Sequence, residues 1–129
     1  MILGIDPGAN PGWALVEESS GELVSCGAKD FPPDGPTLRV FIEHPYIYPR
    51  SPVPPNDIVV LAYRAGLLAS KYKDVTTVLP VTWKGSVSKS VMTRRILAAL
   101  TPSERTIAGA DHNVIDAIGI AKWSWRNKR

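Results

Sequence analysis

The sequence predicts a single α/β domain over residues 1–129, built on a mixed five-stranded sheet with packed helices. Five short runs rich in apolar residues have the length of strands and are bounded by turn residues. From residue 57 onward, three segments place apolar residues at helical spacing. A chain of 129 residues with 44% hydrophobic residues supports one core and is too short for two.

The expected strands are Ile2–Asp6, Trp13–Glu17, Glu22–Ala28, Leu38–Glu43 and Val75–Val81. Turns rich in Gly, Pro and Ser separate the first three strands, which favours an antiparallel meander. Three prolines and one glycine between residues 30 and 37 indicate a loop before the fourth strand.

The expected helices begin at side chains that can cap them. Asn56 is expected to cap a helix over Asp57–Tyr72. Ser86 or Ser88 is expected to cap a second helix, which runs to about residue 100. The last helix is expected over Asp111–Trp125. The loop His44–Pro55 carries five prolines and two tyrosines, and connections of this length are often functional.

Composition excludes several classes of protein. No stretch approaches the roughly 20 continuous apolar residues of a membrane span. The N-terminus lacks the basic region of a signal peptide. The single Cys26 cannot form an internal disulfide, and no Cys/His cluster suggests zinc. We therefore expect a cytoplasmic protein without a membrane partner.

Charge is distributed unevenly along the chain. Residues 1–37 hold one basic and six acidic side chains, whereas residues 84–129 hold nine basic and three acidic side chains. A basic region on one side of a domain is typical of nucleic-acid binding. The alternative is an ordinary solvated basic surface.

Three acids stand where strands end or inside an apolar helix. Asp6 and Glu43 each end a predicted strand, and Asp116 interrupts the apolar pattern of the last helix. His112 and Asn113 precede Asp116 by one helical turn and can share its face. Buried carboxylates are costly unless they are paired or bound to a metal. Three of them can hold two Mg²⁺ or Mn²⁺ ions, which suits phosphodiester hydrolysis.

Each acid also has a plainer interpretation. Asp6 could start the turn at Pro7-Gly8, and Glu43 could be a surface acid at a loop entry. Asp116 could pair with His112 or Lys122.

Three segments of the chain resemble motifs of a known family. The segment from Ile2 to Gly8, followed by Gly12-Trp13-Ala14, resembles the first motif of the RuvC-type Holliday-junction resolvases. Phe41-Ile42-Glu43 resembles the second motif, and residues 112–117 resemble the last one, especially in phage-type members. The resemblance covers nearly the whole chain and implies a ribonuclease-H-like fold. It also suggests a phage origin, and hence the cytoplasm of the host.

The resemblance implies a Mg²⁺-dependent endonuclease that resolves four-way DNA junctions. Such enzymes act as homodimers, make paired symmetric nicks, and use two Mg²⁺ ions per active site, for which Mn²⁺ can substitute. Asp6, Glu43 and Asp116 would be metal ligands. The fourth position of the family, usually Asp or His, is Asn113 here, and His112 beside it is the alternative.

The resemblance also implies residues that contact DNA. Tyr46 lies three residues after the second carboxylate, where the family has an aromatic that stacks on junction bases; the alternative is packing within its own loop. Lys84 and Lys89 resemble basic residues near the scissile phosphate, and Lys89 would also act at the catalytic centre. Arg94 and Arg95 fit contacts to phosphates that are independent of sequence.

The chain departs from the family at one point, and two of three rival functions remain open. The family's long helix between the third and fourth strands is expected to be missing, because only residues 30–37 fill that interval.

An actin-like ATPase would need a second domain, for which the chain is too short. Nuclease action on other branched DNA, on RNA or on hybrids remains an alternative, as does a non-catalytic nucleic-acid-binding protein.

Overall fold

A computed structural model describes residues 1–8, 10–30 and 32–127. Its strands are β1 (Ile2–Asp6), β2 (Gly12–Val16), β3 (Leu23–Gly27), β4 (Arg39–Glu43) and β5 (Asp74–Val78). Its helices are α1 (Pro55–Ala69), α2 (Pro80–Lys84), α3 (Lys89–Ala98), α4 (Pro102–Ala108) and α5 (His112–Arg126). The sheet has the order β3-β2-β1-β4-β5, with β1–β2–β3 antiparallel and β1–β4–β5 parallel. This confirms the predicted mixed five-stranded α/β architecture.

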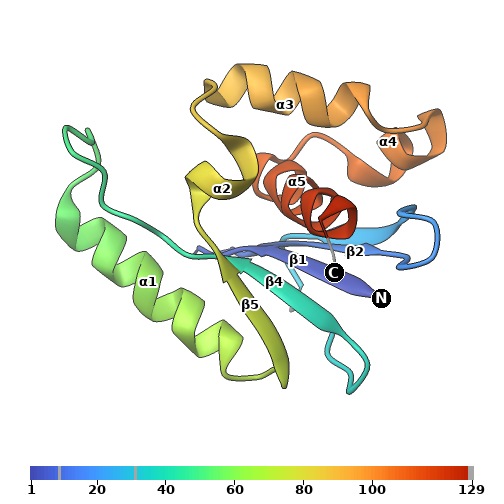
Figure 1. Ribbon diagram of the computed structural model, residues 1–129, viewed down its shortest axis with the longest axis horizontal. Coiled ribbons are helices and arrows are strands. Elements are labelled where there is room, and N and C mark those ends of the chain that lie inside the picture. Colours follow the sequence, from blue (N-terminus) through green and yellow to red (C-terminus); the bar gives the residue numbers. More distant parts are fainter. Residues whose placement is uncertain (9, 31, 128–129) are drawn as a thin grey trace.

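Helices cover the two faces of the sheet unequally (Figure 1). Helix α5 crosses one face, with α2, α3 and α4 around it, and α1 lies on the other face. Side chains alternate between the two faces along β1, so Ile2 points toward α5, whereas Leu3 and Ile5 point toward α1. The α5 face forms the larger buried core, and the α1 face forms a smaller cluster around Leu3, Ile5, Val40, Ile42 and Leu68.

Two glycines let α5 lie directly on the sheet. A Cβ atom on Gly4 would lie 2.5 Å from the carbonyl oxygen of Ala117, and one on Gly12 would lie 2.0 Å from that of Asn113. Both distances are far below van der Waals contact, so only glycine fits at these two positions of β1 and β2. The backbone of α5 therefore comes close enough to β1 to place its side chains at the end of the sheet.

A buried ion pair fastens α4 and β3 to α5. Oε2 of Glu104 accepts hydrogen bonds from the backbone N–H of Leu23, at 2.7 Å, and from the Lys122 ammonium. Oε1 accepts from the N–H of Thr101, completing a capping box at the start of α4. Burial alone would raise the pKa of Glu104, but these donors outweigh it and hold the pKa below its ordinary value.

Removing the cation of this pair is expected to destabilise the fold. The side chains of Lys122 and Glu104 are 14% and 5% exposed, so Lys122→Met leaves a buried carboxylate without its counter-charge. We expect the free energy of unfolding to fall by about 3–5 kcal/mol. Urea denaturation measures this, with Arg126→Met, on an exposed residue of the same helix, as the control. An equal loss in both variants would contradict the role of the pair.

Several predicted element boundaries were wrong. Strand β5 ends at Val78 rather than Val81, and Pro80 begins the unpredicted helix α2. Asn56 does not cap α1: Pro54 is the N-cap residue and Pro55 stands first in the helix, where its missing N–H requires no partner. Helix α4 was also not predicted.

Other expectations were confirmed. Ser88, one of the two predicted candidates, caps α3 by accepting from the N–H of Val91. In the described part of the β3–β4 connection there is no helix, as expected.

None of the helices in the described part of the chain has the length and apolar character of a membrane span.

Candidate active site

Asp6 and Glu43 come to the same edge of the sheet. They are the last residues of β1 and β4, which are parallel neighbours paired as far as Ile5 with Ile42. By strand alternation, Asp6 and Glu43 point to the face opposite to Ile5 and Ile42, which is the face that α5 covers. Two carboxylates thus end neighbouring strands under the same helix.

Asp116 reaches this edge from α5. The contacts of Gly12 with Asn113 and of Gly4 with Ala117 fix this stretch of the helix against β2 and β1. Asp116 lies between these contact points and is partly buried, as are Asp6 and Glu43. The sheet edge and α5 therefore bring the three predicted acids within electrostatic reach of one another.

All three carboxyl groups have raised pKa values, and burial is the first cause in each case. Burial first, and then the charges of Glu43 and Asp116, raise the pKa of Asp6 from 3.8 to about 8, against the opposing charges of Lys84 and Lys89. Burial also raises the pKa of Glu43 and of Asp116. Clusters of carboxylates with raised pKa values are typical of functional sites.

The carboxylates are not gathered around a single point. Within residues 1–8, 10–30 and 32–127, no group of three or more His, Cys, Asp or Glu side chains is arranged to hold a metal ion. The assignment of Asp6, Glu43, Asp116 and Asn113 as metal ligands therefore stays a prediction.

Two lysines provide the positive charge of the cluster. Nζ of Lys84 lies 4.0 Å from Oε2 of Glu43. The charges of Lys84 and Lys89 lower the pKa of all three carboxyl groups, so both lie near them. Arg94 and Arg95 are exposed on α3, and neither contributes to these shifts. Of the four predicted basic residues, the structure brings only the two lysines to the acids.

The fourth predicted site position, one helical turn before Asp116, has two candidates, His112 and Asn113, and their contacts differ. The charge of His112 lowers the pKa of Asp116, which places the exposed imidazole within electrostatic reach of that carboxyl group. The amide of Asn113 instead donates to the carbonyl of Asn10 at 3.4 Å, and its backbone N–H is capped by Asp111. The geometry favours His112 as the neighbour of Asp116, while Asn113 contacts the β1–β2 turn.

Trp83 is a site residue that the sequence analysis missed. Its Nε1–H donates to Oε2 of Glu43 at 2.7 Å, across 40 positions of sequence. The only local signal was its place directly before Lys84. A contact between such distant residues has no signature in spacing.

Tyr46 lines a groove beside Glu43. This groove encloses about 490 Å³, and its lining includes Tyr46, Tyr48, Val81 and Lys84. Tyr46 is 51% exposed, and its ring meets that of Tyr48 edge-on, with centroids 5.0 Å apart. The N–H of Val81 donates to the Tyr48 hydroxyl at 3.3 Å, which fastens the loop to α2. Tyr46 therefore both packs within its loop and presents ring surface to solvent.

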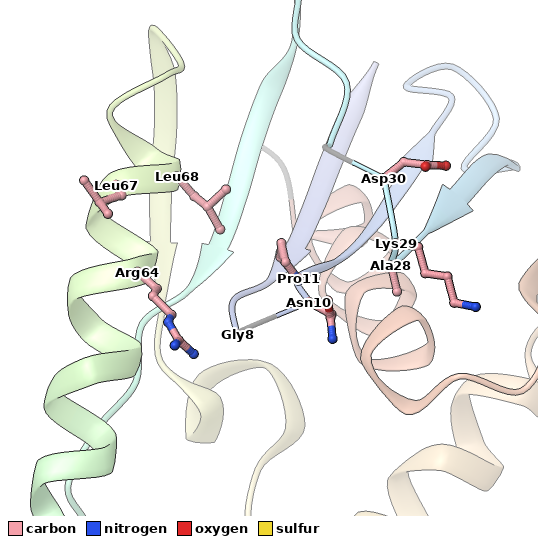
Figure 2. Close-up of a pocket in the computed structure, with 9 residues that line it drawn as sticks. All are labelled: Gly8, Asn10, Pro11, Ala28, Lys29, Asp30, Arg64, Leu67 and Leu68. Carbon is pink, nitrogen blue, oxygen red and sulfur yellow. The ribbon is translucent and has the colours of Figure 1, made fainter.

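A second hollow of about 410 Å³ lies between α1 and the β1–β2 turn (Figure 2). Arg64 and Leu67 come from α1 on one side, and Lys29 and Asp30 follow β3 on the other. None of the three clustered carboxylates lines it. It is separate from the candidate site.

Comparison with known proteins supports the fold. No protein-family model matches the chain, and no curated protein sequence matches it significantly. A structure of T. thermophilus RuvC in complex with Holliday junction substrate is similar, with a TM-score of 0.58 and 18% identity over 98% of this chain and 96% of that one. A second Thermus thermophilus RuvC structure has a TM-score of 0.53 and 18% identity, covering 97% and 95% of the two chains. The chain therefore has the ribonuclease-H-like fold of RuvC over nearly its whole length.

Proposed function

We propose that the chain is a divalent-metal-dependent endonuclease that resolves four-way DNA junctions. The observation that carries this proposal is the cluster of Asp6, Glu43 and Asp116, three partly buried carboxylates with raised pKa values at one edge of the sheet. The fold is that of RuvC, and one similar RuvC structure holds a Holliday junction substrate.

The chemistry of the cluster fits Mg²⁺ or Mn²⁺. Carboxylate oxygens are the hard ligands that these ions prefer. Burial is the first cause of the raised pKa values of Asp6, Glu43 and Asp116, and the two nearby lysines oppose it only in part, so a bound cation would stabilise the ionised carboxylates. We assign these three residues as ligands for two ions. Asn113 would join them only after its amide leaves the carbonyl of Asn10, to which it donates. When bound, such ions activate a water and stabilise the leaving oxygen of the phosphodiester.

Without metal, the protein is expected to lose stability as pH rises. The folded-state pKa of Asp6 is about 8 against an ordinary 3.8, so the folded state binds more protons than the unfolded state between these values. The free energy of unfolding should therefore fall between about pH 4 and pH 8. Thermal denaturation in EDTA measures this. Asp6→Asn should flatten the dependence, and Mg²⁺ at pH 8 should restore stability. Constant stability in EDTA would contradict the raised pKa of Asp6.

The remaining residues would act on the substrate and the water. Lys84 and Lys89 would bind the phosphate next to the carboxylates, and Arg94 and Arg95 would bind phosphates farther along the DNA backbone. His112 would orient the attacking water and accept its proton, because an imidazole suits general base catalysis near neutral pH.

Tyr46 is expected to contribute by stacking on an unpaired junction base. A base stacked on an aromatic ring contributes about 1–3 kcal/mol, so Tyr46→Ala should slow junction cutting by roughly tenfold or more. Tyr46→Phe keeps the ring and should cut at close to the wild-type rate. Single-turnover cutting rates, with thermal denaturation to confirm folding, check this. Equal rates for a well-folded Tyr46→Ala variant would remove the stacking role.

We propose α1 as the interface of a homodimer. The helix exposes Val59, Val60, Tyr63 and Leu67, whose exposed fractions range from 48% to 69%. Burying such residues against a second copy would remove apolar surface from water. A twofold dimer would place two sites on opposite strands of a symmetric junction, which paired nicks require.

The test is cutting of a substrate panel with Mg²⁺ and with EDTA. The panel contains a synthetic four-way DNA junction, a linear duplex, a flap and an RNA–DNA hybrid, each labelled on every strand in turn. We expect paired, Mg²⁺-dependent nicks in the junction and little cutting of the others. Preferential cutting of the flap or hybrid would reassign the substrate. Tight junction binding without any cutting would show a non-catalytic binding protein and overturn the proposal.

A further inference from the structure

The hydrogen bond between Trp83 and Glu43 joins a neutral donor to a carboxylate, and both side chains are largely buried. Trp83 is 6% exposed and the Glu43 side chain 15% exposed. The distance of 2.7 Å from Nε1 to Oε2 is short for an N–H donor and is typical of charge-assisted bonds. The bond lowers the pKa of Glu43, against the burial that raises it.

Packing holds the indole ring in place. A Cβ atom on Gly119 of α5 would lie 2.6 Å from Cζ3 of the Trp83 ring and 2.7 Å from Cδ1 of Ile96. Glycine inside a helix costs about 1 kcal/mol relative to alanine, yet here it makes room for the ring. The donor to Glu43 is thus carried by a ring that lies against α5, the helix that also supplies Asp116.

The two oxygens of Glu43 have different surroundings. Oε2 accepts from Trp83 and has the Lys84 ammonium 4.0 Å away. Among the residues that the structure describes, Oε1 receives no hydrogen bond. One oxygen is occupied by the protein, and the other remains available to a ligand.

We propose that Trp83 is a positioning residue of the site: its indole N–H holds Oε2 of Glu43 and leaves Oε1 as the single oxygen that binds a divalent metal. This inference rests on the proposed function, because it assigns Glu43 to the metal. Groups that hold a ligating side chain from behind orient it and tune its basicity. Without the indole N–H, the carboxylate would turn and sample geometries that do not bind the ion.

The competing explanation is that Glu43 merely satisfies the buried indole N–H of Trp83, because a buried indole N–H usually finds a hydrogen-bond partner. The two explanations differ in what Trp83→Phe changes. Phenylalanine keeps an aromatic ring against Gly119 and removes only the donor. If the bond served the tryptophan alone, metal binding would not change.

The experiment is titration of the protein with Mn²⁺, in which the EPR signal of the free ion reports the dissociation constant. Loss of a group that orients a metal ligand typically costs 10–100-fold in affinity, so Trp83→Phe should weaken Mn²⁺ binding by about tenfold or more. Trp123→Phe, on a partly buried tryptophan of α5, is the matched control and should change it by less than about twofold. In a Glu43→Ala background, Trp83→Phe should have no further effect.

Equal Mn²⁺ affinity in wild-type protein and a folded Trp83→Phe variant would overturn the inference, and so would an equal loss in the Glu43→Ala background. If Trp83→Phe does not fold, the NMR chemical shift of the Trp83 indole N–H in the wild-type protein provides the test. Addition of Mg²⁺ should change this chemical shift more than that of the Trp123 indole N–H, and equal changes would contradict the inference. A different result would refute the proposed function and not this inference: wild-type protein that binds Mn²⁺ but cuts no nucleic acid.

Discussion

Asp6→Asn should abolish junction cutting while the protein still folds and binds the junction. Asp6 is the most strongly perturbed of the three carboxyl groups, with a pKa raised to about 8 by burial and by its two acidic neighbours. An amide is neutral and a weaker metal ligand, so the ions that activate water would be lost. We expect the cutting rate to fall by about 10³-fold, equivalent to roughly 4 kcal/mol of transition-state stabilisation.

Two further observations should accompany that loss. Removing a negative charge beside Glu43 and Asp116 relieves repulsion, so metal-free Asp6→Asn should be more stable than wild type above pH 7. Junction binding should be unchanged or tighter, because the phosphate contacts are assigned to lysines. Single-turnover cutting, a binding titration in Ca²⁺ and thermal denaturation measure the three quantities. The control is Asp30→Asn on an exposed acid. Cutting by Asp6→Asn at the wild-type rate would refute the site.

Gly12→Ala should be the most damaging small substitution in the sheet. The added Cβ would lie 2.0 Å from the carbonyl oxygen and 2.2 Å from the carbonyl carbon of Asn113. These are backbone atoms of α5, so no side-chain rotation relieves the clash and the helix must move. We expect the free energy of unfolding to fall by about 3 kcal/mol or more. Any protein that still folds should cut poorly, because Asp116 follows Asn113 by three residues and moves with the helix.

A matched glycine provides the control for this prediction. Gly66 lies exposed in α1, and a Cβ there would meet nothing within 4 Å. Gly66→Ala should raise the free energy of unfolding by about 0.5–1 kcal/mol, because alanine loses less conformational freedom in a helix than glycine. Urea denaturation compares the two variants. Equal stability of Gly12→Ala and wild type would show that α5 is not seated on β2 as described.

The sequence predicted the elements whose pattern is local. Strands β1 and β4 are apolar runs ended by an acid, so both the strands and the acids Asp6 and Glu43 could be read from them. Their parallel pairing under α5 brings those acids together, and no local pattern contains that fact. The order of elements and the resemblance of three motifs supplied it instead.

The errors concern short elements and distant contacts. Helix α2 has five residues and follows a strand rich in β-branched residues, so its apolar positions were interpreted as more strand. Helix α4 carried a readable signal, because Thr101 and Glu104 have the spacing of a capping box. The pairing of Trp83 with Glu43 depends on how α2 packs against α5, which only the three-dimensional structure shows.

The measurement that tests the central claim most directly is the location of bound Mn²⁺ by anomalous scattering in crystals of the protein with an uncut four-way junction. We expect anomalous peaks at the sheet edge, within direct coordination distance of carboxylate oxygens of Asp6, Glu43 and Asp116 and beside a junction phosphate. Manganese absent from this edge, or a junction phosphate bound elsewhere on the domain, would contradict the claim that these three carboxylates form the active site.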